Sequence, residues 1–276
     1  MYKTISILFL LVWFHQNLRA SLADSLQSER MEEVEVKAYS PRTLSDDRNG
    51  RLYWNMESLA AMPQVLGSAD PLRSLHLLPG VATNNDYTSG IHIQGSAASQ
   101  SILNMDGTPI FNASHLLGLF SVFNASHFRG MSFGKNRHDA AFSNRLGGEV
   151  SFYPTDSIAH KVHLDATVSF MESEGTLTLP VGEHSTLYLS GRGSYLNLLY
   201  GNLLEIDEMK LRYGLQDYNL TFVQQAGAHD KIRLSLYHGQ DRMNLLQEDF
   251  ANENKLKWQH TAAALHWHHN SSRYIL

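Results

Sequence analysis

The stretch KVHLDATVSF, residues 161–170, alternates apolar and polar side chains without interruption. Every second residue from 162 to 170 is apolar, whereas positions 163, 165, 167 and 169 carry His, Asp, Thr and Ser. Successive side chains of a β-strand point to opposite faces of its sheet. The pattern therefore predicts a strand with one apolar face and one polar face.

The same two-residue period returns five times towards the C-terminus, with polar turns such as GEHS and GAHD between the stretches. We therefore predict six consecutive antiparallel strands in this part of the chain. The further stretches are GTLTLPV (175–181), STLYLSGRGSY (185–195), LQDYNLTFVQQ (215–225), DKIRLSLYHGQDR (230–242) and KLKWQHTAAALHWHH (255–269).

Two architectures explain strands of this kind. In a soluble sandwich the apolar face is a core and the polar face meets water. In an outer-membrane barrel the apolar face meets lipid and the polar face lines the interior. Several stretches run about ten residues, the length of a tilted membrane strand, and Tyr188, Tyr195, Trp258 and Trp267 lie near strand ends. Both features favour the barrel.

Residues 45–156 follow a different pattern, in which short predicted strands lie between short predicted helices. This pattern indicates a compact α+β unit. GSADPLRSLHLLPGV, residues 67–81, predicts a helix that Ser68 or Asp70 caps, that Pro71 begins and that Pro79-Gly80 ends. SILNMDGTPIF, residues 101–111, predicts a hairpin that turns at Asp106-Gly107.

The N-terminus predicts export. Lys3 precedes an apolar core at residues 5–14, and SLA at 21–23 offers small residues for cleavage, so we predict a signal peptide at residues 1–23. No later apolar stretch reaches the roughly 18 residues of a spanning helix. In the following segment, residues 24–44, Val34 and Val36 alternate with charged residues, which predicts a short strand able to add to another sheet.

Composition excludes several classes of function. The 276 residues carry a formal net charge of −5, so nothing favours nucleic-acid binding, and no cysteine is present for a disulfide or a thiol nucleophile. We find no defensible Ser-His-Asp arrangement and expect no enzymatic activity. His266 and His268 share a strand face, but two ligands are too few for a metal centre, so we expect neither a metal nor a cofactor.

The pentapeptide FNASH occurs twice, at residues 111–115 and 123–127. Its Asn-Ala-Ser part fits a glycosylation sequon, although two ends of one short turn can also need the same capping groups. We predict that Ser114 caps the turn that starts at His115 and that Asn124 marks its exit. The sequence favours solvated loop positions for His115, His127 and His138. We also name candidate ligand-facing residues: Ser96, Ser99, Gln100 and His115.

Three stretches between residues 66 and 135 resemble, in order, the plug domain of TonB-dependent outer-membrane receptors, particularly the Bacteroidetes type. LLPGV (77–81) is similar to the end of the first plug helix, and IHIQGS (91–96) looks like the family's Ile-Arg-Gly-Gly strand. NMDGTPIFNASHLLGLFSVFN (104–124) is similar to its Asp-Gly hairpin and helical turn. The resemblance covers roughly residues 31–276, although Gln94 stands where the family usually has arginine.

The resemblance implies an α+β plug domain at residues 45–156, followed at 157–276 by antiparallel β-strands of an incomplete transmembrane β-barrel. It implies a bacterial outer-membrane location, with the plug facing the periplasm. A receptor of this type imports a siderophore, vitamin, peptide or glycan without covalent chemistry. The resemblance also assigns binding of TonB, which ExbB and ExbD energise, to the segment of Glu33, Val34, Glu35, Val36 and Lys37.

The length departs from the family, whose barrels have roughly 22 strands. Six predicted strands leave two open edges, which lipid cannot satisfy. We therefore expect a fragment, a truncated product or half of a split reading frame. Two alternatives stay open: an exported soluble periplasmic binding protein whose later strands form a sandwich, and a non-functional remnant.

Overall fold

A computed structural model describes most of the chain after residue 43. The predicted signal peptide, the segment proposed for TonB and His138 lie outside the described residues. The described ranges are 44–46, 51–61, 69–83, 90–135, 145–203, 205–206, 209–247 and 252–270.

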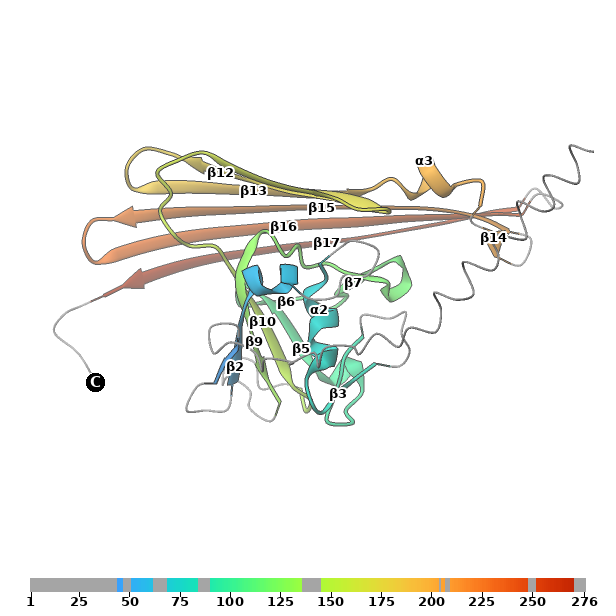
Figure 1. Cartoon of the computed structure of the whole chain (residues 1–276), viewed down its shortest axis with the longest axis horizontal. Coiled ribbons are helices and arrows are strands. Elements are labelled where there is room, and N and C mark those ends of the chain that lie inside the picture. Colours follow the sequence, from blue (N-terminus) through green and yellow to red (C-terminus); the bar gives the residue numbers. More distant parts are fainter. Residues whose placement is uncertain are drawn as a thin grey trace, which may run out of the picture. The chain divides into compact units, whose positions relative to one another are not determined.

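The first part, which we call the α+β unit, is built on a six-stranded sheet with the order β1-β2-β9-β10-β5-β6 (Figure 1). Only the β10–β5 pairing is parallel. The strands are β1 (Leu44–Asp46), β2 (Arg51–Asn55), β5 (Ile102–Met105), β6 (Thr108–Pro109), β9 (Phe128–Gly134) and β10 (Glu149–Pro154).

Short helices and two small hairpins complete the α+β unit. The helices are η2 (Met56–Ala61), α2 (Pro71–Ser74), η3 (Leu75–Leu77), η4 (Ala98–Gln100) and η5 (Leu116–Gly118). The hairpins pair β3 (Val81–Ala82) with β4 (His92–Ile93), and β7 (Ser114–His115) with β8 (Phe120–Ser121). None of the helices in the described ranges has both the length and the apolar composition that crossing a bilayer would require.

Local signals in the sequence explain two of these elements. The Asp70 carboxylate accepts hydrogen bonds from the backbone N–H groups of Leu72 and Arg73, at 2.9 and 3.3 Å, and so caps α2 as predicted. Asp106 and Gly107 both have positive φ, at 49° and 79°, which a two-residue hairpin turn requires. The predicted helix cap and hairpin turn are therefore confirmed.

The second part, which we call the long sheet, has the order β11-β12-β13-β15-β16-β17 and is antiparallel throughout. All six predicted strands are confirmed. They are β11 (His163–Val168), β12 (Glu172–Pro180), β13 (Ser185–Ser194), β15 (Met209–Ala226), β16 (Asp230–Gln247) and β17 (Asn252–His269). Short elements α3 (Leu196–Tyr200) and β14 (Glu205–Ile206) lie between β13 and β15. Among the described strands, β11 and β17 each pair on one side only.

The last three strands have 18 residues each and extend beyond the stretches predicted for them, residues 215–225, 230–242 and 255–269. Their halves differ in character. We call 218–226, 230–238 and 261–269, beside the short turn at 227–229, the proximal halves. The distal halves are 209–217, 239–247 and 252–260.

The apolar side of the strands reverses between the two halves. In the proximal halves the face turned away from the α+β unit carries Leu220, Leu236 and Leu265, while the inner face carries buried Asn219 and Thr221. In the distal halves of β15 and β16 the inner face beyond Asp217 and Asp241 is apolar instead. There Tyr213 and Leu215 are buried with Phe120 of the α+β unit and Leu196 of α3, and Arg212 and Arg242 are exposed on the outer face.

Candidate functional site

The α+β unit contacts the inner face of the long sheet through two groups of buried charged side chains. We call them the His115 cluster and the Asp106 cluster, after the residue that each receives from the α+β unit. Both join residues more than a hundred positions apart in sequence. The His115 cluster comprises His115, Glu172, Arg192, Asp217, Tyr237 and Asp241; the Asp106 cluster comprises Asp106, Asp156, Arg233, Ser235 and His266.

His115 lies between two carboxylates. Its Nδ1 is 2.8 Å from Asp241 Oδ2, and its Nε2 is 3.0 Å from Asp217 Oδ1. A neutral imidazole can donate from only one ring nitrogen, so two carboxylate partners select the imidazolium form. Burial by itself lowers the pKa of His115, but Asp217 and Asp241 outweigh it, and the pKa is raised above its ordinary value. His115 is therefore a cation that the α+β unit places against the inner face of the sheet.

Asp217 is the centre of this cluster. Arg192 donates from Nε and Nη2 to Asp217 Oδ2, at 2.8 and 2.5 Å, and from Nη2 to the Ser121 carbonyl at 2.6 Å. The Tyr237 hydroxyl donates to Asp217 Oδ1 at 2.9 Å. Gly239 leaves room for that hydroxyl, since an added Cβ would lie 2.1 Å from it. One carboxylate thus joins β13, β15, β16 and the α+β unit.

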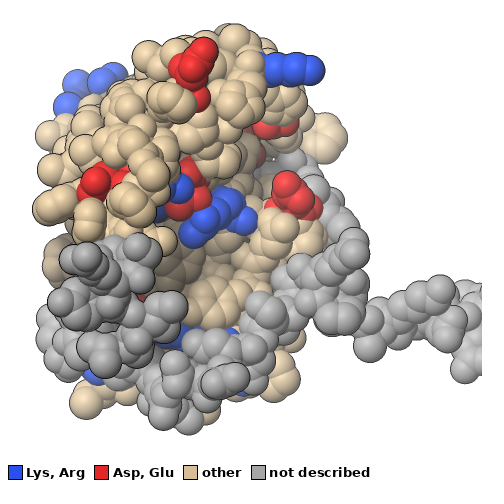
Figure 2. All heavy atoms as spheres, turned by 90° about the vertical axis from the view of Figure 1, so that its left-hand side faces the viewer, with Lys and Arg blue, Asp and Glu red and all other residues tan. Residues whose placement is uncertain are grey.

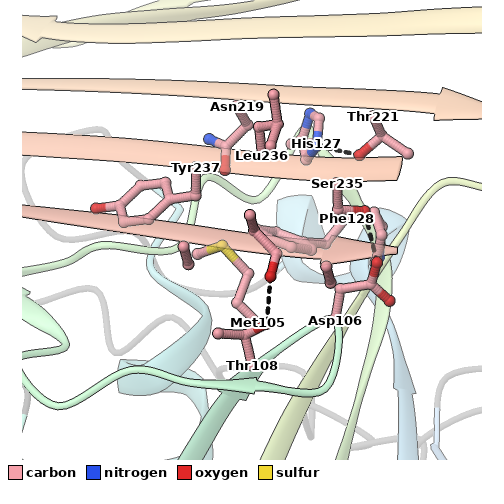
Figure 3. A pocket seen from close by; sticks show the side chains of 14 residues that line it. Met105, Asp106, Thr108, His127, Phe128, Asn219, Thr221, Ser235, Leu236 and Tyr237 are labelled. Carbon is pink, nitrogen blue, oxygen red and sulfur yellow. Dashed lines mark hydrogen bonds between the residues drawn. The ribbon is translucent and has the colours of Figure 1, made fainter. Parts of the chain in front are cut away.

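The Asp106 cluster lies beneath the tip of the β5–β6 hairpin. Arg233 donates to both carboxylate oxygens of Asp106, from Nη2 at 2.5 Å and from Nε at 3.1 Å. Ser235 donates to Oδ2 at 2.5 Å (Figure 3). His266 Nε2 is 3.0 Å from the Asp106 carbonyl. Arg233 also reaches Asp156 at 3.3 Å. The Asp106-Gly107 turn was predicted from its backbone conformation alone. Its Asp106 also attaches the α+β unit to β16 and β17.

Each copy of FNASH ends in a histidine that contacts the inner face of β15. His127 Nε2 lies 2.9 Å from Thr221 Oγ1, and Figure 3 shows the ring directed at that side chain. Burial lowers the pKa of His127 to about 4, so it is neutral where His115 is charged. The prediction of solvated positions is wrong for both, because they are 1% and 3% exposed. The repeat thus marks two contacts with one strand.

Of the two capping roles predicted for this region, the structure shows the one at Asn124 but not the one at Ser114. No side-chain cap bond forms at the start of η5, so the predicted capping role of Ser114 is wrong. Asn124 accepts from the N–H and the hydroxyl of Ser126, at 2.9 and 2.7 Å, which is an Asx turn at the exit. Ser126 in turn contacts Thr176 Oγ1 of β12 at 2.6 Å.

Three of the candidate ligand-facing residues, Ser96, Ser99 and Gln100, lie in one loop, and His115 lies in β7. Ser99 and Gln100 are exposed and Ser96 is half-buried, in the loop around η4. Arg145 donates to the Ser99 carbonyl at 2.5 Å, so this loop contacts the segment before β10. His115 is buried between two carboxylates, and the ligand-facing role of the four residues stays a prediction. An alternating strand with one polar face carries no signal that its charges pair with a distant hairpin.

Two cavities adjoin these contacts. The one drawn in Figure 3, between the Asp106 hairpin and β15–β17, has a volume of about 10 Å³, room for one water at most. A cleft of about 1020 Å³ separates the α+β unit from β11–β13 and is lined by polar residues that include Arg129, Asp165, Glu174 and Thr176. Figure 2 shows acidic and basic side chains beside each other around a hollow in the molecule.

The chain is similar in fold to solved structures of a transporter and of a receptor. The outer membrane transporter YddB from Escherichia coli matches 85% of this chain with a TM-score of 0.60 at 14% identity. A mutant of the ferric enterobactin receptor PfeA from Pseudomonas aeruginosa matches 81%, with a TM-score of 0.54 at 14% identity. The described chain shares their fold. It spans 38% of the length of each.

No protein-family model matches the sequence, and no curated protein matches it at a significant level. In the described ranges no group of three histidine or acidic side chains is arranged to hold a metal ion. His266 and His268 do stack, with ring centroids 6.1 Å apart, but His266 is held by Asp106. The site is thus a set of contacts that hold the α+β unit against the inner face of the long sheet.

Proposed function

We propose that this chain is the N-terminal portion of a TonB-dependent outer-membrane receptor that imports a scarce nutrient by energised transport. The observation that carries the proposal is the reversal of the apolar side along β15, β16 and β17. In the proximal halves lipid can cover the apolar outer face while the polar inner face holds the α+β unit. In the distal halves the apolar face packs inward and the outer face is polar, as in a protein surrounded by water.

The lengths of the proximal halves support their placement in the bilayer. Each proximal half has nine residues (218–226, for example), and a tilted membrane strand needs about 9–11. The transition falls at Gln216, Gln240 and Gln259, which are aligned across the three strands. Short turns of barrels lie on the periplasmic side, so the turn at 227–229 would be periplasmic and the distal halves would extend outwards.

In this proposal the α+β unit is the plug of residues 45–156, inside the barrel strands of 157–276. The His115 and Asp106 clusters hold it there, and a nutrient passes only when these contacts are broken or bypassed. Siderophores, vitamins, peptides and glycans all remain open as substrates. In a bilayer the free edges of β11 and β17 need further strands, because lipid offers backbone groups no hydrogen-bond partners.

A photoprobe dissolved in the bilayer tests the membrane placement. We expect labelling of Leu220, Leu234 and Leu265, which lie on the outer face of the proximal halves. Thr221 and Ser235 serve as inner-face controls, and mass spectrometry of the labelled protein locates each adduct. Labelling that prefers Thr221 and Ser235, or that spares the three leucines, would overturn the proposal.

TonB binding tests the energised step. Residues Glu33 to Lys37, after removal of the signal peptide at 1–23, would add as a strand to TonB, with ExbB and ExbD supplying the energy. Val34→Pro removes a backbone donor, so we expect affinity for the purified TonB C-terminal domain to fall at least about tenfold. Glu35→Gln keeps the backbone donor and should bind within about twofold of the wild type. Equal binding by both variants would exclude strand addition here.

A further inference from the structure

The β7–β8 hairpin contains a strained backbone conformation at Leu116. This residue directly follows β7 and has a φ of 47°, in the left-handed region that favours glycine, asparagine and aspartate. In other residues the Cβ then lies too close to the following carbonyl oxygen. Leu116 therefore keeps this conformation only because neighbouring contacts hold it there.

Contacts to the long sheet stabilise the strained residue. The Leu116 N–H donates to the Tyr213 hydroxyl at 2.5 Å. The ring of His115, the residue before it, lies between the carboxylates of Asp217 and Asp241. The strained conformation thus stands directly beside a side chain whose hydrogen bonds depend on its charge.

We propose that residues 114–118 form a pH-sensitive latch, which protonated His115 holds closed against the long sheet and which opens when His115 loses its proton. The inference rests on the proposed function, because it names the contact of the plug that yields first when a nutrient passes. Phe120, two residues beyond the latch, packs against Tyr213 and Leu215 of the distal halves, which extend outwards in that proposal. The latch therefore lies at the end of the plug that a nutrient meets first.

Proton loss removes one of the two bonds of His115. A neutral imidazole donates from one ring nitrogen only, so the other nitrogen would present a lone pair to a carboxylate oxygen 2.8 or 3.0 Å away. Asp217 keeps Arg192 and Tyr237 as donors. Asp241 is 1% exposed, and its Oδ1 has no hydrogen-bond partner in the described part of the chain. The closed latch would then contain a buried repulsive contact, which opening relieves.

Charged and titratable groups face His115 from each neighbouring strand. They are Glu172 and Glu174 of β12, Arg192 of β13, Tyr213 and Asp217 of β15, Tyr237 and Asp241 of β16 and His260 of β17, and α2 adds Asp70 and Arg73 at the β8 end. On the sheet side four carboxylates therefore surround two cations, Arg192 and His115 itself. This excess of negative charge favours the protonated form of His115.

The pH range of opening follows from the pKa of His115. Burial lowers this pKa, but Asp217 and Asp241 outweigh burial and raise it above the ordinary 6.5. In the open latch the ring meets water and returns to its ordinary pKa. The latch is therefore most stable below pH 6.5, and its opening equilibrium rises about tenfold for each pH unit between 6.5 and the raised value.

The β8 end of the hairpin is held by other groups. The Ser121 N–H donates to Asp70 at 2.7 Å, and the Ser121 carbonyl accepts from Arg192 at 2.6 Å. Neither bond involves the imidazole. Opening is therefore confined to residues 114–118.

Hydrogen–deuterium exchange of the full chain in detergent micelles tests the latch. Mass spectrometry follows each peptide, and rates are corrected for the intrinsic pH dependence of exchange. We expect the protection of residues 114–118 to fall at least about tenfold between pH 6 and pH 9. Residues 102–109 should stay equally protected, because Arg233 holds their turn and guanidinium groups keep their charge. A flat response at 114–118, or an equal fall at 102–109, would overturn the inference.

Variants of His115 separate its charge from its shape. His115→Arg keeps two donors and a charge that does not titrate, so its latch should stay protected from pH 6 to pH 9. His115→Gln is neutral, and at pH 6 its latch should be at least about tenfold less protected than that of the wild type. His92→Gln removes a histidine outside the cluster and should respond like the wild type. Protection of β10, residues 149–154, verifies that each variant is folded. A pH response that persists in His115→Gln would overturn the inference.

A second pair of variants tests the strain. Leu116→Gly and Leu116→Ala both remove the leucine side chain, but only glycine adopts a φ of 47° without strain. We expect residues 114–118 to be at least about threefold better protected in the glycine variant at pH 9. Equal protection would show that the backbone does not favour opening, and would overturn the inference of a strained latch.

Failure of the latch differs from failure of the proposed function. The exchange experiment uses micelles, whereas the photoprobe experiment uses a bilayer. Labelling of Leu220 and Leu234 together with a flat pH response would reject the latch alone and leave the membrane placement standing. A pH response without labelling of these leucines would reject the membrane placement, and with it the role of the latch in transport.

Discussion

Asp217→Ala is expected to lower the free energy of unfolding by about 3–5 kcal/mol, the usual effect of removing one partner from a buried ion pair. The Asp217 carboxylate contacts His115, Arg192 and Tyr237, and none of these side chains is more than 6% exposed. Without it, a guanidinium and an imidazolium stay buried with fewer negative partners. Denaturant unfolding in detergent micelles, followed by tryptophan fluorescence, measures the change.

Asn219→Ala provides the matched control, because Asn219 lies two residues further along the same face of β15 and is also buried. It carries no charge, so we expect a loss of about 1–2 kcal/mol. The double variant Asp217→Asn, His115→Asn should lose less than the sum of its single variants, since each removes the other's charge partner. Equal losses for Asp217→Ala and Asn219→Ala would show that charge is not what holds the α+β unit.

The elements that local chemistry specifies could be predicted from the sequence. Asp70 and Pro71 are adjacent to the helix they begin, and Asp106-Gly107 is sufficient for its own turn. The six strands were predicted because alternation is a property of each strand alone. The lengths of the last three strands were underestimated for a physical reason. In β15 the apolar residues occupy odd positions at Leu211, Tyr213 and Leu215 but even positions at Tyr218, Leu220 and Phe222. The alternation therefore shifts by one residue where the distal and proximal halves of this continuous strand meet.

The clusters could not be predicted in the same way. Asp217, Arg192 and Arg233 occupy polar positions of alternating strands, and such positions read equally well as solvated or as barrel-lining. Their partners, His115 and Asp106, are 102 and 127 residues away along the chain. Only the register of the strands and the position of the hairpins bring these groups together. The sequence did contain one usable signal of these contacts: the pentapeptide FNASH occurs twice, and its two histidines lie twelve residues apart.

His127 gives the second large expected effect, a loss of stability in acid. Burial lowers its folded-state pKa to about 4, from the ordinary 6.5. The unfolded chain therefore binds the proton more readily, and stability falls as the pH drops from about 6.5 towards 4. Between pH 7 and pH 4.5 this residue alone should remove about 2.5 kcal/mol. His115 has the opposite linkage: its raised pKa stabilises the fold at low pH, and that contribution declines as the pH rises through the raised value.

His127→Gln isolates the effect, because glutamine keeps a donor for Thr221 Oγ1 and does not titrate. Unfolding free energies of the wild type and the variant are compared at pH 7 and at pH 4.5. Carboxylates and the other histidines titrate alike in both proteins, so only the difference between the two pH responses matters. We expect the variant to lose about 2.5 kcal/mol less than the wild type on acidification. Parallel pH responses would mean that His127 reaches water in the folded state, and that its contact with β15 opens readily.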